Sequence, residues 1–349
     1  MHARRLSASG LVFGIALVIV GSGIAQEPVG LRGSPIAGKT GLRLLVDDAT
    51  PFLFDVDTGS VTRLRGLGAK RHDGYVLAVS RSAAVVVDFR PSPLKAQLYL
   101  ARSGRTTVTA LGAARDVVPD ADGRGVWVTR VHSKAQCALQ HIALDGRSAA
   151  TRAIPCTWVI RPGGSLGLVV RRARVIDPST GRTVIASRRG VIAVAGARLL
   201  LTGPSAHDVP DDTLAQTLAL LDSSTRAERT MRVPRTTGSL EDPAIDPRGR
   251  YIALPFANPS YQQSGSQVLD VWVVDTVTGA LTHLPGTPAY VHLKGTSMHW
   301  THDGRLVLLG EDDNGSFVAL WRPRQPKLGL KRIRLPARTG ASDTFAPLD

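Results

Sequence analysis

The sequence predicts an all-β fold built from repeated four-stranded sheets, and three observations carry that prediction. The chain holds 35 glycines and 22 prolines among its 349 residues, a turn-rich composition that suits many short strands. Short runs rich in Val, Ile, Leu and Thr alternate with polar turns, and no segment shows a convincing helical period. The same hairpin pattern returns about every 44 residues along the chain.

The repeated unit is a short apolar run, a polar turn and a Thr-, Val- or Arg-rich run. Each unit is predicted to be a β-hairpin, because Gly at its tip can adopt a positive φ and Asp or Ser can accept nearby backbone N–H groups. The seven units are FLFDVDTGSVTRL (52–64), QLYLARSGRTTVTAL (97–111), HIALDGRSAATRAI (141–154), RVIDPSTGRTVIA (174–186), LALLDSSTRAERTMRV (218–233), VWVVDTVTGALTHL (271–284) and VALWRPRQPKLGLKRIRL (318–335).

A second strand pair is expected between consecutive hairpins. Its turn is clearest in IDPRGRYIAL (245–254), and WTHDGRLVLL (300–309) has the same form. The apolar run after each turn is predicted to be buried on both faces between neighbouring sheets. Further turns of this kind are expected in RHDGYVLAV (71–79), PDADGRGVWVT (119–129) and RPGGSLGLVV (161–170).

Four strands per repeat and seven repeats predict a β-propeller over residues 42–349. One four-stranded sheet cannot bury both of its faces, whereas a ring of sheets buries each face against the next. The pattern allows six to eight blades, and the seven hairpins favour seven. The first sheet lacks an obvious inner strand, so TFAPL (344–348) or the stretch just after the first 25 residues is expected to supply it and close the ring.

Residues 240–335 resemble the TolB-like and WD40-like propeller repeats of exported bacterial proteins. The motif in those repeats is Asp-Pro-x-Gly-Arg or Asp-Gly-Arg, then a strand, then a hairpin with an Asp-x-x-Thr-Gly tip. The residues that match it are Asp246, Pro247, Gly249, Arg250, Asp275, Thr278 and Gly279, with Asp303, Gly304 and Arg305 in the next repeat.

A weaker form of the same resemblance covers most of residues 42–335. It implies a propeller fold and, for most such proteins, a binding scaffold. Some of them carry a hydrolase domain after the propeller. Since no further domain follows residue 349, a fused peptidase is not expected here.

Residues 1–25 are predicted to be an export signal, followed by a linker over residues 26–41. Arg4 and Arg5 precede the apolar run LVFGIALVIV (11–20), and small residues follow it. An uncleaved membrane anchor is the alternative, and it would be the chain's one contact with a membrane. The protein is therefore expected to be exported, and to be extracellular or associated with the cell envelope.

Cys137 and Cys156 are the two cysteines of the chain. In an exported protein this pair suggests one disulfide, and two buried free thiols are the alternative. No CxxC pair or His-rich partner accompanies them, so a metal site is not expected there.

Arginine supplies 36 of the 43 basic residues, and the formal net charge is +15. Basic residues concentrate in residues 161–189 and 322–338, which makes a polyanion a candidate ligand. Outside a cell the polyanion would be an anionic wall polymer or a lipid headgroup rather than nucleic acid, and a solvated arginine-rich surface is the alternative. The candidate residues are Arg171, Arg172, Arg174, Arg324, Lys331, Arg332 and Arg334.

Three motifs invite a catalytic or metal interpretation that their context opposes. GGSLG (163–167) matches a nucleophile-elbow pattern, but its place in the repeat predicts a turn. The acidic stretches DADG (120–123) and EDDN (311–314) lack the spacing of a calcium loop. The third motif consists of His292, His299, His302 and Asp303. It lies partly on an inner strand, where successive side chains face opposite ways and cannot all converge on one site. We predict no catalytic residue, no metal and no cofactor.

Two long insertions, ANPSYQQSGSQ (257–267) and GPSAHDVPDDTLAQ (203–216), interrupt strand pairs that elsewhere are linked tightly. Binding residues concentrate on propeller loops, so Tyr261, Gln262 and Gln263 are candidate ligand-binding residues, and a tolerated surface insertion is the alternative.

The sequence as a whole favours a monomeric, non-enzymatic binding or scaffolding module at the cell envelope. Its partner would be an envelope protein or an anionic wall polymer. Two alternatives stay open. One is a propeller hydrolase or lyase whose site lies in the central channel. The other is an electrostatic binder of anionic wall polymers or lipids.

Overall fold

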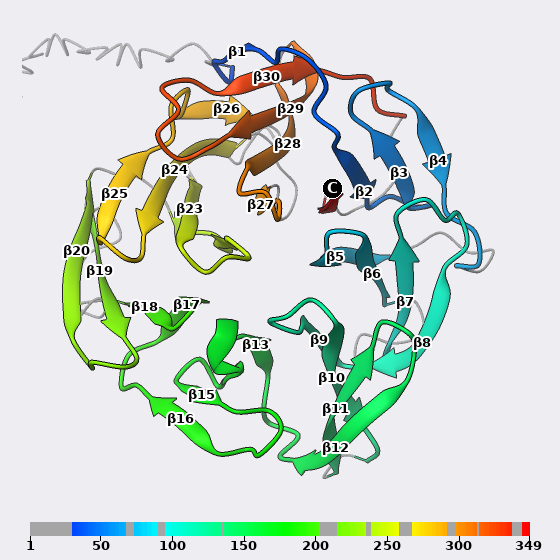
Figure 1. Ribbon diagram of the computed structural model, residues 1–349, viewed down its shortest axis with the longest axis vertical. Helices are drawn as coiled ribbons and strands as arrows, with labels where there is room; N and C mark the ends of the chain where they lie inside the picture. The colour runs from blue at the N-terminus through cyan, green and yellow to red at the C-terminus, as the bar shows by residue number, and fades with distance from the viewer. Residues whose placement is uncertain are drawn as a thin grey trace, which may run out of the picture.

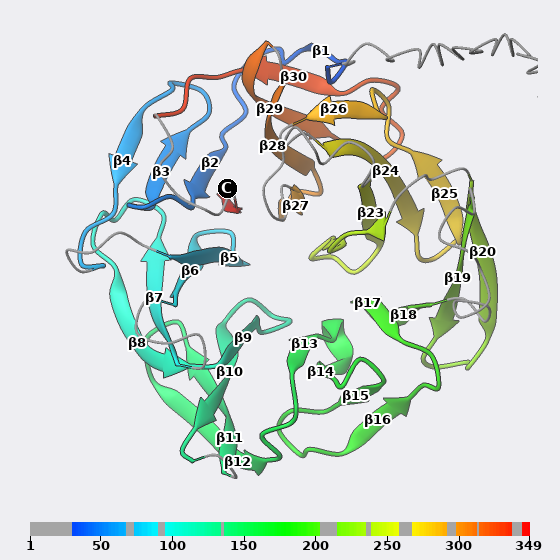
Figure 2. The same ribbon diagram turned by 180° about the vertical axis from the view of Figure 1, so that it is seen from behind.

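The chain folds into a closed ring of seven antiparallel sheets, or blades, whose strands run in order from the centre to the rim (Figure 1). The reverse view shows the same closed ring (Figure 2). A computed structural model describes residues 30–67, 73–89, 95–133, 136–202, 215–234, 239–257, 267–291, 298–312, 314–336 and 344–349. The predicted all-β propeller of seven four-stranded blades is confirmed.

The first five blades each contain four strands. The first has the order β31 (Phe345–Leu348), β2 (Arg43–Val46), β3 (Phe52–Asp55), β4 (Val61–Arg63). The second and third follow in chain order with β5 (Gly74–Ser80), β6 (Ala83–Asp88), β7 (Ala96–Arg102), β8 (Thr109–Ala114), then β9 (Asp116–Pro119), β10 (Gly125–Val131), β11 (Cys137–Ala143), β12 (Ser148–Ile154). The fourth and fifth contain β13 (Ile160–Pro162), β14 (Leu168–Val170), β15 (Arg174–Ile176), β16 (Thr183–Ala186), then β17 (Val191–Ala195), β18 (Arg198–Thr202), β19 (Ala215–Asp222), β20 (Glu228–Pro234).

The last two blades carry additional short strands. In the sixth, β21 (Ser239–Leu240) and β22 (Ala244–Ile245) both pair with β23 (Tyr251–Ala257), while β25 (Ala280–His283) and β26 (Ala289–Val291) both pair with β24 (Gln267–Asp275). The seventh contains β27 (Met298–Trp300), β28 (Leu306–Asp312), β29 (Gly315–Trp321), β30 (Gly329–Arg332), and β1 (Ser34–Pro35) adds to its outer edge.

The last strand of the chain closes the ring. β31 pairs antiparallel with β2, from Phe345 opposite Val46 to Leu348 opposite Arg43. This confirms the predicted closing segment 344–348. The stretch near the N-terminus instead lies at the rim, where β1 runs parallel to β30 and the Ser34 N–H donates to the Leu328 carbonyl at 2.8 Å. The C-terminal strand therefore completes the first blade at its inner edge, and the N-terminal segment adds to the seventh blade at its outer edge.

All seven predicted hairpins connect the third and fourth strands of a blade. The tip of the sixth hairpin follows the chemistry expected of Asp and Gly. The carboxylate of Asp275 accepts the backbone N–H groups of Val277 at 2.9 Å and Thr278 at 3.3 Å, and the Arg250 guanidinium at 2.9 Å. Burial alone would raise the pKa of Asp275, but these hydrogen bonds hold it below its usual value.

One inner turn differs from the prediction. In the second blade, Gly74 begins the innermost strand β5, and the turn to β6 is formed by Arg81 and Ser82 rather than by the His-Asp-Gly of residues 72–74. The physical reason is that this tight turn needs neither Gly nor Asp. The Ser82 N–H faces the Ser80 hydroxyl oxygen at 3.4 Å, which gives no marked signal in the sequence.

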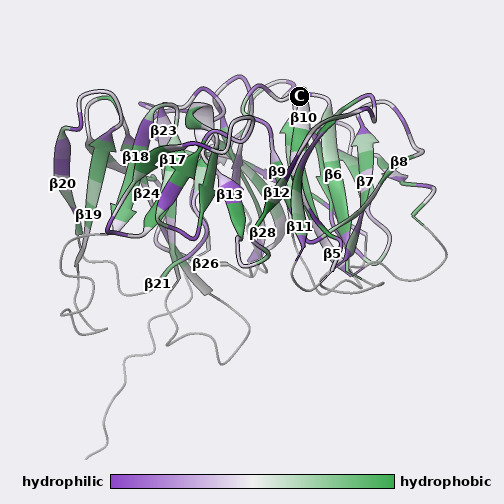
Figure 3. Cartoon of the chain, turned by 90° about the horizontal axis from the view of Figure 1, so that it is seen from below, coloured by the Kyte–Doolittle hydropathy of each residue, from purple (hydrophilic) through white to green (hydrophobic). Residues whose placement is uncertain are grey.

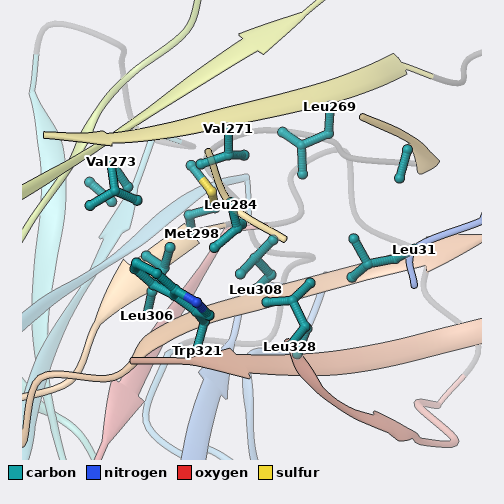
Figure 4. Close-up of a cluster of buried hydrophobic side chains, with 14 of the residues drawn as sticks. Leu31, Leu269, Val271, Val273, Leu284, Met298, Leu306, Leu308, Trp321 and Leu328 are labelled. Carbon is teal, nitrogen blue, oxygen red and sulfur yellow. The ribbon is translucent and has the colours of Figure 1, made fainter. Parts of the chain in front are cut away.

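The hydrophobic core lies between the blades. All six residues of β6 are buried, and the side chains of the first five alternate between two neighbouring clusters, with Val85 in one and Val86 in the other. The contact between the sixth and seventh blades contains a large cluster, in which Val271 and Val273 of β24 lie near Leu308 of β28 and Trp321 of β29 (Figure 4). The prediction that the inner runs are buried on both faces is confirmed.

Basic side chains also join neighbouring blades. Arg152 on the outer strand of the third blade donates to the Ser179 carbonyl at the hairpin tip of the fourth, at 3.0 Å. Arg229 and Lys331 hold the same position on the fifth and seventh blades and donate to the hairpin tips of the sixth and first. A guanidinium offers five N–H donors, which suits this role. Part of the arginine excess therefore serves contacts within the ring.

The predicted disulfide is present. Cys137 at the start of β11 is bonded to Cys156 in the connection between the third and fourth blades, with their Cα atoms 5.1 Å apart. Within the described ranges, no helix is both long and apolar enough to cross a membrane.

Candidate functional site

The turns that join the first and second strands of each blade gather at one end of the ring, which we call the inner-turn face. It comprises residues 81–82, 120–124, 163–167, 196–197, 246–250 and 301–305, and the end of the chain lies on it because the Asp349 N–H donates to the Arg81 carbonyl at 2.9 Å. In the side view, the strands stand across the thickness of the ring and this face is uppermost (Figure 3). The connections between second and third strands lie on the other end.

A cavity of about 580 Å³ occupies the centre of the ring at the inner-turn face. Every blade contributes to it, because its lining residues come from β5, β9, β13, β17, β22, β27 and β31 and from the turns that follow them. A volume of roughly 300–1,000 Å³ is typical of a site that encloses a small molecule or a side chain of a partner.

Glycines allow the turns around this cavity to touch one another. Gly164, Gly196 and Gly249 all have a positive φ, which glycine adopts without the cost a Cβ would bring. A Cβ on Gly249 would lie 2.5 Å from the backbone nitrogen of Gly196. A Cβ on Gly164 would lie 2.9 Å from the carbonyl oxygen of Gly196. Backbone therefore packs directly on backbone across three successive blades, which fixes the shape of this part of the rim.

Asp246, the first residue of the turn after β22, is a buried carboxylate in the cavity wall. Its side chain is 1% exposed, and its Oδ1 accepts the backbone N–H of Arg248 at 3.1 Å, with the Arg248 Nε 3.6 Å away. Its Oδ2 is buried and accepts no hydrogen bond from the residues that the structure describes. Such an oxygen is unusual, since buried polar atoms are nearly always hydrogen-bonded.

Asp120 and Asp122, in the turn after β9, bring two further carboxylates. The Oδ2 of Asp120 forms a hydrogen bond with the Nε2 of His141 at 2.9 Å, and the His141 ring lies 4.9 Å from the Trp127 ring. Asp122 accepts the Arg124 N–H at 2.8 Å, and its side chain is 52% exposed. One carboxylate is thus anchored below the rim and the other is open to solvent.

His299 and His302 lie on the seventh-blade side of the cavity. The Nε2 of His299 is buried and has no hydrogen-bond partner among the described residues, and its ring meets the Phe345 ring edge-on at 4.8 Å. Burial lowers the pKa of His299 to about 4, so the ring is neutral near pH 7. The Nδ1 of His302 lies 3.7 Å from the Asp349 carboxylate.

The buried imidazole makes the stability of the fold depend on pH. Between its folded pKa of about 4 and the ordinary value of 6.5, the unfolded chain binds a proton at His299 that the folded chain does not. Stability therefore falls as pH decreases through this window, by about 2 kcal/mol between about pH 7 and pH 5. We expect His299→Gln to lose this part of the pH dependence, as measured by denaturant unfolding across the range.

The matched control is His302→Gln, because the His302 side chain is 33% exposed and no buried ring is removed. Asp177 and Asp222 do not interfere. Side-chain hydrogen bonds from Ser179 and Ser224, respectively, are the largest causes that lower the pKa of each to about 2, so their contribution is lost below the window of His299. Equal pH slopes for the wild type and His299→Gln would contradict a neutral buried His299.

The predicted loop candidates Tyr261, Gln262 and Gln263 lie outside the described residues. The seven basic candidates fall into two groups on different blades, with Arg171, Arg172 and Arg174 on the fourth blade and the other four on the seventh, at opposite sides of the ring (Figure 1). Their positions in the seventh blade are the hairpin tip for Arg324, strand β30 for Lys331 and Arg332, and the segment after β30 for Arg334. The fold does not bring the seven together.

Several of these basic residues already have partners within the chain. Arg332 forms an ion pair with the buried carboxylate of Asp312 and lies over the Phe317 ring. Lys331 donates to the Asp57 carbonyl at 3.3 Å. Arg171 donates to the Thr157 hydroxyl at 2.9 Å. These contacts favour a structural role for part of the two basic segments.

The motifs considered as catalytic or metal sites also have structural roles or lie apart from one another. Residues 163–167 form a turn between β13 and β14 that contains a short 3-10 helix, Gly164–Leu166, and Ser165 lines the cavity. Asp303 pairs with Arg305 at 2.9 Å and Arg322 at 2.6 Å, while His299 and His302 line the cavity. His292 lies outside the described residues. Across the ranges described above, no group of three His, Cys, Asp or Glu side chains is arranged to hold a metal ion.

Asp246 and Arg248 were not predicted from the sequence to be site residues. Their signal was the recurrence of an Asp-containing turn after several inner strands, at 120–124, 246–250 and 301–305, which was interpreted as a feature of the fold. The structure shows that these turns surround one cavity, so the fold motif and the candidate site share residues.

Comparisons with known proteins provide information about the fold alone. No protein-family model matches the chain. No curated protein matches it in sequence. Solved structures do match. A prolyl endopeptidase structure has a TM-score of 0.55 at 10% identity, covering 89% of this chain and 51% of that one. The acylaminoacyl peptidase of Pyrococcus horikoshii has a TM-score of 0.52 at 10% identity, covering 84% and 52%.

TolB from Acinetobacter baumannii is also among the structural neighbours, with a TM-score of 0.47 at 12% identity over 88% of this chain and 66% of that one. The propeller fold that the resemblance to TolB-like and WD40-like repeats implies is confirmed by the seven blades of the structure. This chain spans just under two thirds of the TolB chain and about half of the two peptidase chains that it matches. At these identities the likeness concerns architecture alone.

Proposed function

We propose that this protein is a binding module that holds a partner at the central cavity of the inner-turn face. The observation that supports this most is the cavity itself: all seven blades contribute to one concave space of about 580 Å³ whose wall contains carboxylates, imidazoles and glycine turns. Such a space can enclose a side chain or a short chain segment and hold it through several polar groups.

The construction of the rim supports binding without a large rearrangement. The turns follow innermost strands that each pair with the second strand of their blade, and the contacts among Gly164, Gly196 and Gly249 leave the turns of three blades little freedom to move apart. A site formed in advance avoids the entropic cost of ordering loops during association.

The place of action that we propose is outside the cytoplasm, at the cell envelope, with an envelope protein as the partner. The Cys137–Cys156 disulfide supports export, because disulfides persist in oxidising compartments. The arrangement of the basic residues supports a discrete partner more than a polyanion, because the two groups lie on opposite sides of the ring and several members are engaged within the fold.

The test is to fill the cavity without disturbing the core. Ala121 is exposed on the rim and lines the cavity, so Ala121→Trp places an indole in the space while leaving the blades intact. We expect partner retention on isolated envelopes to fall by at least about tenfold, since a binding step that loses its central contact typically loses 1–2 kcal/mol or more.

The matched control is Val277→Trp, because Val277 is 58% exposed at a hairpin tip of the sixth blade, away from the cavity. Retention is measured at low and at moderate salt. Equal retention of the two variants would remove the cavity proposal. Equal retention that also disappears at moderate salt would favour an electrostatic interaction with a polyanion.

A further inference from the structure

The lining of the cavity is acidic although the chain as a whole has a formal charge of +15. Asp120, Asp122 and Asp246 line it, and among the lining residues that the structure describes Arg248 is the sole Arg or Lys. The Arg248 side chain is 56% exposed and lies beside Asp246, so it offsets one of the three carboxylates. The local charge is therefore opposite in sign to the charge of the whole molecule.

The cavity wall also presents more acceptors than donors. The backbone N–H groups of Gly123 and Gly249 are used within their own turns, where they donate to the carbonyl oxygens of Asp120 and Asp246. Proline has a carbonyl but no N–H. The lining includes five prolines, Pro119, Pro162, Pro243, Pro247 and Pro347. A ligand that brings hydrogen-bond donors suits this wall better than one that brings acceptors.

Asp246 adds an independent observation. It is a buried carboxylate whose Oδ2 accepts no hydrogen bond from the described part of the chain, and leaving a buried polar atom without a hydrogen bond is costly. His299 leaves a second buried polar atom, Nε2, without a partner in the same wall. Because burial lowers the pKa of His299 to about 4, this ring adds no positive charge near neutral pH.

We infer that the cavity takes up a cationic nitrogen group, a primary ammonium or a guanidinium at the end of a slender chain. The inference rests on the proposed function and names the chemistry of what is bound there. A Lys or Arg side chain of a partner protein would supply such a group, and so would a free polyamine. Either one brings a positive charge and several N–H donors to a wall of carboxylate and carbonyl oxygens.

The direct test measures binding of three probes to the purified full chain by calorimetry. They are a blocked Gly-Gly-Lys-Gly-Gly peptide, the same peptide with Nε-acetyl-lysine, and spermidine. We expect acetylation to weaken binding at least about tenfold, because it removes the charge and two of the three donors. Stronger binding of the lysine peptide assigns the group to a polypeptide, and stronger binding of spermidine assigns it to a polyamine.

Asp122 and Asp145 form a matched pair for mutation. Each lies in a turn and pairs with the arginine two residues later, and their side chains are 52% and 53% exposed. Asp122 lines the cavity, whereas Asp145 lies in the hairpin tip between β11 and β12. We expect Asp122→Asn to weaken binding of the charged probe about three- to tenfold and Asp145→Asn to leave it unchanged.

Asp246→Asn gives the larger loss, about tenfold or more, because its carboxylate is buried. A melting temperature within the range of the wild type shows that this variant is folded, and Asp122→Asn provides the same test where no buried group is changed.

The inference is overturned if the acetylated peptide binds as well as the lysine peptide, if none of the probes binds at millimolar concentration, or if Asp122→Asn and Asp145→Asn have equal effects. Calcium chloride that competes the lysine peptide away at lower concentration would also overturn it, by assigning the carboxylates to a metal ion. These failures leave the proposed function standing as long as Ala121→Trp still lowers partner retention. If Ala121→Trp retains the partner, the proposed function itself fails.

Discussion

Replacing Phe345 by alanine is expected to lower the free energy of unfolding by about 3–5 kcal/mol. Phe345 is fully buried in β31, the strand that comes from the end of the chain and completes the first blade. Its ring packs in the cluster between the first and seventh blades and meets the His299 ring at 4.8 Å. The substitution therefore leaves a cavity at the position where the ring closes.

Equilibrium unfolding in denaturant, followed by circular dichroism, measures this effect. Val61→Ala is the control, because Val61 lies on the outer strand of the same blade and is 38% exposed. That variant should differ from the wild type by no more than about 0.5 kcal/mol. A loss below about 1 kcal/mol for Phe345→Ala would show that closure does not depend on the packing of β31.

Removing the disulfide is expected to cost about 3 kcal/mol. Cys137 and Cys156 are 19 residues apart, and joining two positions at this separation restricts the unfolded chain by an amount of that order. The bond also holds the connection to the fourth blade beside the start of β11, where the Arg115 guanidinium donates to the carbonyls of Cys156 and Trp158. The expected loss is therefore one of stability, with a local effect between the third and fourth blades.

The measurement compares wild type and the Cys137→Ser/Cys156→Ser double variant with and without reductant. Reductant should destabilise the wild type to about the level of the double variant and leave the double variant unchanged. Insensitivity of the wild type to reductant under unfolding conditions, together with equal stability of the two proteins, would contradict a stabilising disulfide.

The architecture was predictable because most repeats have turn-forming residues at recurring positions in the sequence. The tip DTVTG at 275–279 and the turn DPRG at 246–249 both occupy the positions that their chemistry predicts. The closing strand was predictable from the missing inner strand of the first sheet. The inner turn of the second blade was not, because Arg81 and Ser82 turn the chain without Gly, Asp or Pro.

The site was less accessible from sequence than the fold. Its carboxylates come from different blades, and Asp120 and Asp246 are 126 positions apart, so spacing along the chain holds no information about their convergence. The same holds for the arginines. In the sequence, nothing distinguishes Arg152 and Arg229 from arginines on the surface. In the structure they donate to carbonyls of the next blade, and the carbonyl that each one meets depends on how neighbouring blades pack.

Site-specific photo-crosslinking determines whether the partner occupies the cavity of the inner-turn face. A benzophenone side chain at Ala121 reports on the cavity, and the same side chain at Val277 reports on an exposed hairpin tip outside it. We predict one discrete crosslinked species from position 121 that an excess of the lysine peptide suppresses, and none from position 277. Crosslinks from position 277 alone, or from both positions with equal yield, would contradict binding in the cavity.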